Sequence, residues 1–134
     1  MNPLIAAYKN TRYHVFNTGI TICIDETNLL LDKLLSKQDA ISWAYITAYN
    51  PFSKTYTNEA NDSRHRLLLQ SVAGFSSFEG EGKGKDESWP PEKSLLILGI
   101  SNEQAIAIGN EYEQNAIVYG EVGKAAQLLL LRTI

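Results

Sequence analysis

The feature that most constrains the fold is an apolar run over residues 41–49, with Asn50 and Pro51 directly after it. Nearly every side chain in the run is aliphatic or aromatic, which is typical of a strand covered on both faces. Proline has no N–H to donate to a sheet ladder, and it restricts the backbone of the residue before it. We therefore expect a buried central strand that ends in a sharp turn at Asn50.

Periodicity predicts the other elements. Isoleucine alternates with small or polar residues over 20–24, the pattern of a half-buried strand. Leucines at helical spacing mark a helix over about 27–37, and Ser101 with Gln104 forms a capping box. The expected elements are, in order, a short helical segment at 3–10, strands at 12–16 and 20–24, a helix at about 27–37, the central strand, a helix at about 57–73, strands at 75–78 and 94–100, a helix after Ser101, and a strand pair at 116–119 and 126–131.

The length and composition are those of one folded domain. The chain has 134 residues, of which 44% are hydrophobic and 20% are charged, so it can form a single core. It contains no internal repeat and no linker. We expect one α+β domain over residues 1–134, with a mixed, mostly antiparallel sheet of about five to seven strands packed by three main helices.

Charge and hydropathy exclude several classes of partner. The net charge is −3, and the largest basic cluster, residues 64–66, is too small to track a duplex, so nucleic acid is unlikely as a partner. No apolar run approaches the roughly 20 residues that span a bilayer, and the N-terminal residues do not resemble a signal peptide. Cys23 is the one cysteine, which fits a reducing compartment. We expect a cytoplasmic protein with no membrane segment.

Hydrogen-bonding side chains gather after the central strand, where a helix is expected to begin. They are Asn50, Ser53, Asn58, Asn61 and Arg64. Leaving such groups buried and unpaired costs about 1–3 kcal/mol each. They therefore either satisfy one another in an internal network or line a pocket open to water. An arginine near a helix N-terminus suits a phosphate or carboxylate, which favours a polar or anionic ligand.

Residues 79–92 form the least regular stretch, and we expect a long loop there. Its glycines do not make a nucleotide-binding loop, because no helix follows to direct backbone N–H groups at phosphate. Glu81 and Glu92 have the chemistry of a general acid and base, although solvated carboxylates are the commoner case. Trp89 either covers a ligand or anchors the loop on the core. The sequence leaves open whether the loop is a lid or is disordered.

Several ordered motifs together resemble one bacterial family, the domain of unknown function 3293. The motifs are residues 46–53, Asn58, Asn61, residues 80–82, 89–94, 98–100 and 114–118. The family pattern has tryptophan where this chain has Tyr49, and usually a single proline where this chain has Pro90 and Pro91. The resemblance covers nearly the whole chain, and it implies a fold and a site region but no chemistry.

Three functional hypotheses follow. The leading one is a protein that binds a polar or anionic small molecule, with a nucleotide as one candidate. The second is a hydrolase of a phosphorylated or nucleotide substrate, with Glu81 or Glu92 as base and Arg64 on the substrate anion. The third is a protein–protein interaction module. The predicted ligand-binding residues are Asn50, Ser53, Asn58, Asn61, Arg64, Glu81, Trp89 and Glu92.

No cofactor is expected, and no metal, because His14, His65 and Cys23 lack the spacing of paired ligands. The oligomeric state is undecided, and a homo-oligomer stays open.

Overall fold

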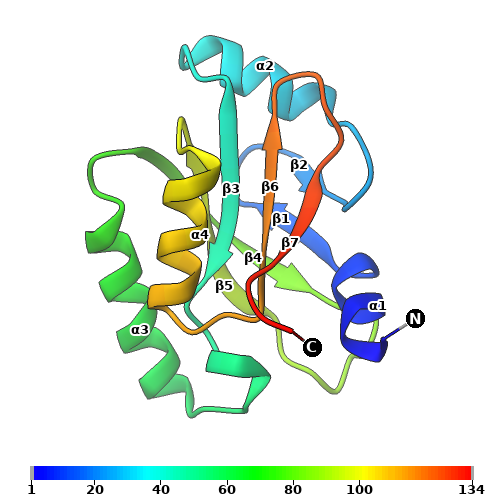
Figure 1. Cartoon of the computed structure of the whole chain (residues 1–134), viewed down its shortest axis with the longest axis vertical. Coiled ribbons are helices and arrows are strands. Elements are labelled where there is room, and N and C mark those ends of the chain that lie inside the picture. Colours follow the sequence, from blue (N-terminus) through cyan, green and yellow to red (C-terminus); the bar gives the residue numbers. More distant parts are fainter. Residues whose placement is uncertain (1, 134) are drawn as a thin grey trace.

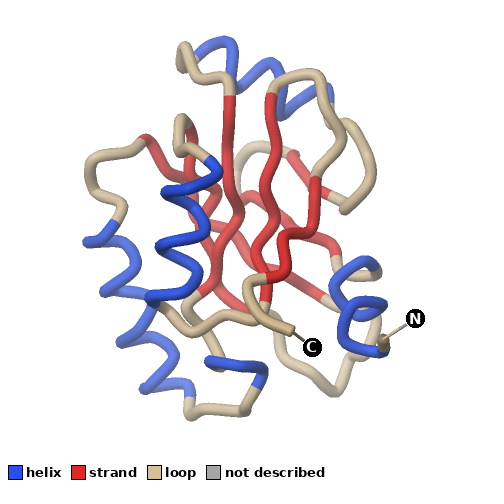
Figure 2. Tube along the Cα trace, in the orientation of Figure 1, coloured by secondary structure: helices blue, strands red, loops and turns tan. Residues whose placement is uncertain are grey.

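The structure is a computed structural model and describes residues 2–133. Its helices lie around one sheet (Figures 1 and 2). In chain order the elements are α1 (Pro3–Lys9), β1 (Arg12–Val15), β2 (Ile20–Ile22), α2 (Leu29–Lys37), β3 (Ser42–Thr47), a short 3-10 helix η1 (Pro51–Ser53), α3 (Asn58–Ser71), β4 (Ser76–Lys83), β5 (Glu92–Leu98), α4 (Asn102–Glu111), β6 (Ala116–Glu121) and β7 (Gln127–Leu130).

The sheet has seven strands in the order β2-β1-β4-β5-β3-β6-β7, and every pair of neighbours is antiparallel. The α+β class predicted from the sequence is therefore confirmed. The expected central strand is β3, which pairs with β5 on one side and β6 on the other. Its first five residues are all buried. Both of its faces are covered, as the unbroken apolar run predicted.

Alternate residues of β3 point into two separate cores. Ala44 and Ile46 pack under α3 and α4 on one face of the sheet. Trp43 and Tyr45 belong to the core on the other face, to which α2 contributes Leu31 and others. The backbone of β6 at Gly120 packs directly against Trp43, because a Cβ on Gly120 would lie 2.5 Å from the indole ring.

The sheet curls around this second core. The backbone N–H of Asp25, just after β2, donates to the carbonyl of Ala126 at 2.8 Å, and the N–H of Ala126 donates to Glu26 O at 3.0 Å. These two bonds join the β2 end of the sheet to the start of β7, so the outer strands meet. In Figure 1, α2 lies across one end of the curl and α1 lies at the other. The result is a curved wall with a sheltered interior.

One boundary prediction is wrong in an informative way. The segment Gly80-Glu81-Gly82, expected in the long loop, belongs to β4, which pairs with both β1 and β5. A strand needs no continuous apolar pattern where its neighbours supply both ladders. The irregular stretch between β4 and β5 is reduced to residues 84–91.

The ends of two helices are set by polar residues. The N-cap of α2 is Asn28, whose side chain accepts from Leu31 N at 2.9 Å, so the helix begins at Leu29, slightly later than the expected start near residue 27. The left-handed residue after α4 is Glu113. The capping box at the start of α4 is confirmed. Local polar residues predict that a helix ends nearby, but several neighbours can take the cap, and packing selects one.

Gly80 gives a testable consequence of this ladder. A Cβ there would lie 1.9 Å from the carbonyl oxygen of His14 on β1. Gly80→Ala is therefore expected to lower the free energy of unfolding by about 1–3 kcal/mol, because β4 must move away from β1. Urea denaturation measures the loss. Gly74→Ala is the control, since a Cβ there meets nothing within 4 Å; equal effects of the two substitutions would contradict this packing.

Candidate functional site

The turn after β3 has an unusual backbone. Asn50, Phe52 and Ser53 all have positive φ, at 46°, 53° and 61°. Such conformations cost about 1–3 kcal/mol each in non-glycine residues and persist only where surroundings enforce them. Here the Phe52 N–H donates to Glu113 O at 2.7 Å, and the Gln114 amide donates to Tyr49 O at 3.1 Å. The segment after α4 thus holds the turn in place.

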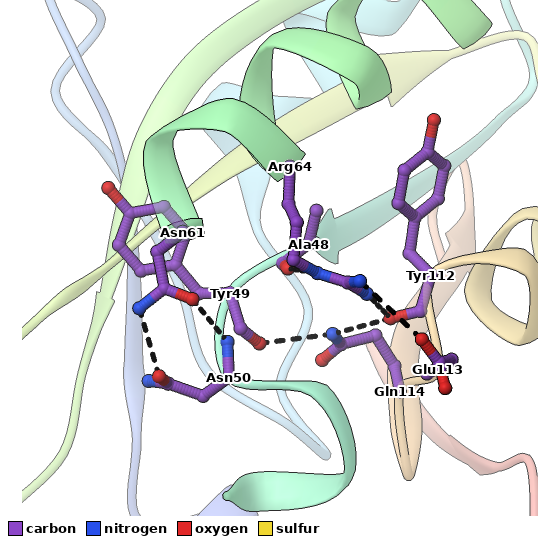
Figure 3. A network of polar contacts seen from close by, with 8 residues as sticks. All are labelled: Ala48, Tyr49, Asn50, Asn61, Arg64, Tyr112, Glu113 and Gln114. Atoms are coloured by element: carbon purple, nitrogen blue, oxygen red, sulfur yellow. Dashed lines mark hydrogen bonds and ion pairs between the residues drawn. The ribbon is translucent and has the colours of Figure 1, made fainter. Parts of the chain in front are cut away.

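Asn50 is the centre of the hydrogen-bond network in this turn (Figure 3). Its N–H donates to Asn61 Oδ1 at 2.8 Å, and Asn61 Nδ2 donates back to Asn50 Oδ1 at 2.9 Å. The same Oδ1 accepts from Tyr56 N at 2.9 Å. Asn50 Nδ2 donates to Glu92 Oε2 at 2.7 Å. Asn50 therefore connects α3 on one side of the sheet with the carboxylate of Glu92 on the other.

Arg64 has an internal role. Its Nε donates to Ala48 O at 2.7 Å, and its Nη2 donates to Tyr112 O at 2.5 Å. Nη1 lies 3.5 Å from a carboxylate oxygen of Glu113 (Figure 3). The guanidinium thus joins the end of β3 to the end of α4, with its hydrogen-bond donors directed at protein acceptors.

A cavity of about 500 Å³ lies inside the curled sheet, beside the turn. Its wall is largely aromatic and aliphatic, with contributions from Leu4, Ala7, Tyr8, Tyr13, Tyr45, Trp89, Ile117, Val118 and Leu128. The polar and charged lining residues include Asn50, Ser53, Thr47, Glu92, Ser94, Gln114, Lys85 and Asp86. The cavity is therefore formed by α1, the sheet interior, the turn after β3 and the 84–91 loop.

Of the eight ligand-binding residues predicted from the sequence, four line the cavity and four do not. Asn50, Ser53, Trp89 and Glu92 line the cavity, although they come from the turn, the loop and the start of β5. The others are not among its lining residues. Asn61 is buried and hydrogen-bonded to Asn50, and Arg64 joins the end of β3 to the end of α4. Asn58 is exposed at the start of α3. Glu81 lies in β4, opposite His14 and Lys93.

Sequence reasoning missed the aromatic half of the cavity. Tyr8, Tyr13 and Tyr45 come from α1, β1 and β3, which only the curl of the sheet brings together. Their hydroxyl groups gave one signal, because a buried tyrosine needs a hydrogen-bond partner. Tyr13 donates to Tyr8 O at 3.0 Å, and Tyr45 donates to His14 O at 2.7 Å.

Glu92 is the electrostatically unusual group in the cavity. Burial raises the pKa of its carboxyl above the ordinary value, and hydrogen bonds from Asn50 and Trp89 offset part of that rise. Trp89 Nε1 donates to the same oxygen as Asn50, at 3.3 Å. Within the described chain, residues 2–133, no Lys, Arg or His nitrogen lies within 4.0 Å of the carboxylate. Burial also raises the pKa of Tyr8, Tyr13 and Tyr45, so their phenols stay neutral.

The raised pKa predicts a pH dependence of stability. A carboxyl group with a higher pKa in the folded protein than in the unfolded chain stabilises the fold fully below its unfolded pKa, and this contribution is lost as pH rises through the folded pKa. Glu92→Gln should therefore melt at a higher temperature than wild type at pH 7, with the gap closing below about pH 4.5. Thermal unfolding over this pH range measures the difference. A variant that melts lower at pH 7 would show that the charged carboxylate stabilises the fold.

A second polar group lies across the sheet, around α3. His65 is buried, and its Nε2 lies 2.8 Å from Glu79 Oε1. The Tyr49 hydroxyl donates to Asp62, which also lies 3.3 Å from the Lys93 ammonium. Among residues 2–133, no group of three or more His, Cys, Asp or Glu side chains is arranged to hold a metal ion.

These features define a single-domain α+β protein with a sheltered, partly aromatic cavity inside a curled antiparallel sheet. A family model described as "Protein of unknown function (DUF3293)" matches residues 46–117, which is more than half of the chain. The chain belongs to this family, as its ordered motifs predicted. No curated protein and no solved structure matches it. In the described part of the chain, no helix is long and apolar enough to cross a membrane.

Proposed function

We propose that this protein binds a small organic molecule in the cavity inside the curled sheet. The observation that carries the proposal is a sheltered space of about 500 Å³ with a partly buried carboxylate in its wall. Small-molecule sites are concave, mostly apolar and of roughly 300–1,000 Å³, with a few polar groups that fix orientation. The ligand's hydrocarbon or ring portion contacts the tyrosines, and its polar group faces Asn50, Ser53 and Glu92.

Two features of the site lower the stability of the fold, and this supports a role for them in ligand binding. A strained turn and a partly desolvated carboxylate both lower stability, and such groups concentrate at functional sites. Packing alone would favour an apolar residue in place of Glu92. The anionic ligand expected from the sequence relied on Arg64, whose donors are bound to protein acceptors. The proposed small-molecule site is therefore the cavity rather than Arg64, in a cytoplasmic protein of bacterial source.

An enzyme is the second candidate, on one observation. A carboxyl with a raised pKa in a cavity has the properties of a general acid or base, and Glu92 is such a group. The hydrolase hypothesis would then use Glu92 rather than Glu81. Turnover that Glu92→Gln removes, with ligand binding retained, would distinguish the enzyme from a binding protein.

A blocked cavity tests the proposal. Ala7 lies on α1 in the cavity wall and is itself exposed, so Ala7→Phe should place a phenyl ring in the cavity and obstruct it with little effect on the core. A fragment screen by ligand-observed NMR and thermal shift should find binders that stabilise wild type by about 2.7 kcal/mol at a hundredfold excess over Kd. Ala7→Phe should lose these responses.

Ala107→Phe is the matched control, because Ala107 is also an exposed helical alanine but lies on α4 outside the cavity. It should keep every response. A screen with no binders, or binders that Ala7→Phe retains, would overturn the proposal. A stable protein partner recovered together with an empty screen would support the interaction-module hypothesis instead.

A further inference from the structure

An acceptor oxygen in the cavity wall lacks a hydrogen-bond partner among residues 2–133, whereas most of the side-chain donors there already have one. Glu92 Oε2 accepts from both Asn50 and Trp89, and within residues 2–133 no hydrogen bond engages Oε1. The carboxylate therefore has an oxygen with unused acceptor capacity, on a partly buried side chain. An anionic group placed against it would be repelled in a low-dielectric environment.

The side-chain donors that line the cavity are, in contrast, mostly bound already. The amide of Asn50 is bound to Glu92, and both donor bonds of Gln114 go to the carbonyls of Tyr49 and Tyr112. The Thr47 hydroxyl donates to Lys93 O at 2.6 Å, and the Ser94 hydroxyl donates to Glu92 O at 3.0 Å. A ligand that only accepts hydrogen bonds would be left chiefly with the Tyr8 and Ser53 hydroxyls and the Lys85 ammonium, whereas a ligand that donates would satisfy Glu92.

The aromatic lining suits the same ligand chemistry. Tyr8, Tyr13, Tyr45 and Trp89 all contribute to the cavity, and the ring centroids of Tyr13 and Tyr45 are 5.3 Å apart. The faces of neutral aromatic rings attract cations. Two other charged residues line the cavity, Lys85 and Asp86 on the loop, and their opposite charges leave Glu92 as the net charge of the lining.

We propose that the ligand is an organic cation, with a protonated amine or amidinium on a ring or short hydrocarbon. Its nitrogen donates to Glu92 Oε1, and its hydrocarbon portion packs among the tyrosines. This inference rests on the proposed function and specifies the ligand class. A bound cation would also stabilise the ionised carboxylate and offset the cost of its burial.

A matched set of fragments tests the class directly. The probes are benzylamine and benzamidine as cations, benzyl alcohol as the neutral analogue, and benzoate and phenyl phosphate as anions. Affinities are measured by ligand-observed NMR titration at pH 7.5 and low ionic strength. The cations should bind at least about tenfold more tightly than benzyl alcohol, because a charge-assisted hydrogen bond is about twice as strong as a neutral one. The anions should bind more weakly still.

Glu92→Gln is the decisive variant, because it keeps an oxygen for Asn50 and Trp89 and replaces the open acceptor with an NH₂ donor. It should abolish the preference for cations. Glu87→Gln removes the same charge from an exposed position on the loop that does not line the cavity, and should keep the preference. Circular dichroism establishes that both variants fold; if Glu92→Gln does not, the order of affinities for wild type decides alone.

The possible results distinguish a failure of the cation inference from a failure of the proposed binding site. Tighter binding of benzoate or phenyl phosphate than of benzylamine, or an equal cation preference in Glu92→Gln, would overturn the cation inference and leave the cavity as a binding site. If no probe binds and the wider fragment screen is also empty, the proposed function itself fails.

Discussion

Replacing Arg64 by methionine is expected to lower the free energy of unfolding by about 3–5 kcal/mol, one of the two largest effects predicted for this protein. The substitution removes the Arg64 hydrogen bonds to the carbonyls of Ala48 and Tyr112, of which the Tyr112 carbonyl keeps the Gln114 amide as a donor. These bonds join the end of β3 to the end of α4, the two segments that support the turn after β3. Hydrogen bonds to a charged group contribute about 1.5–3 kcal/mol each. The Arg64 side chain is only 21% exposed, so water replaces these bonds poorly.

Urea denaturation followed by circular dichroism measures this loss. Glu113→Gln is the control, because its contact with Arg64 is long, at 3.5 Å, and its side chain is 49% exposed. An exposed ion pair of this kind contributes at most about 1 kcal/mol. The folded Arg64→Met variant should bind cavity fragments as wild type does. Normal stability with lost binding would instead make Arg64 a ligand contact, as the sequence first indicated.

Asn50→Ala is expected to have an effect of similar size, about 3–5 kcal/mol. Alanine removes the side-chain bonds to Asn61, Tyr56 and Glu92, and it must also adopt the left-handed conformation at φ 46°. Asn50→Gly removes the same bonds without the steric cost. It should therefore be more stable than the alanine variant by about 1 kcal/mol.

Asn17→Ala separates these two causes. Asn17 also has a positive φ, 63°, but lies exposed in the turn between β1 and β2. Its loss should be confined to the backbone term, about 1–2 kcal/mol, in the same urea experiment. Asn50→Ala should cost clearly more. If the two alanine substitutions lower the free energy of unfolding equally, the hydrogen bonds of the Asn50 side chain contribute nothing to stability.

Much of the fold followed from local patterns. The apolar run at β3, the alternating isoleucines of β2 and the capping box at Ser101 each specify a backbone conformation through nearby residues. The motif order was sufficient to identify the family. Local patterns were insufficient for Gly80, because a glycine-rich segment becomes a strand only when two neighbours supply its ladders.

In the candidate site, too, one part followed from local sequence and another did not. Its turn was predictable, since Asn50 and Pro51 end a strand by their own chemistry. The direction of each polar side chain was not: Arg64 and Asn61 turn toward backbone and Asn50, whereas Glu92, distant in sequence, reaches the cavity.

The sequence by itself determined the secondary structure around the site and the polar groups available to it. Only the tertiary structure decided which of those groups face a shared space. The curl that joins residues 25–26 to Ala126 encloses an interior, and α1 contributes Tyr8 to it from the far end of the chain. Periodicity shows which residues share a face of one element. It contains no information on which distant element will cover that face, because that choice depends on the packing of the whole sheet.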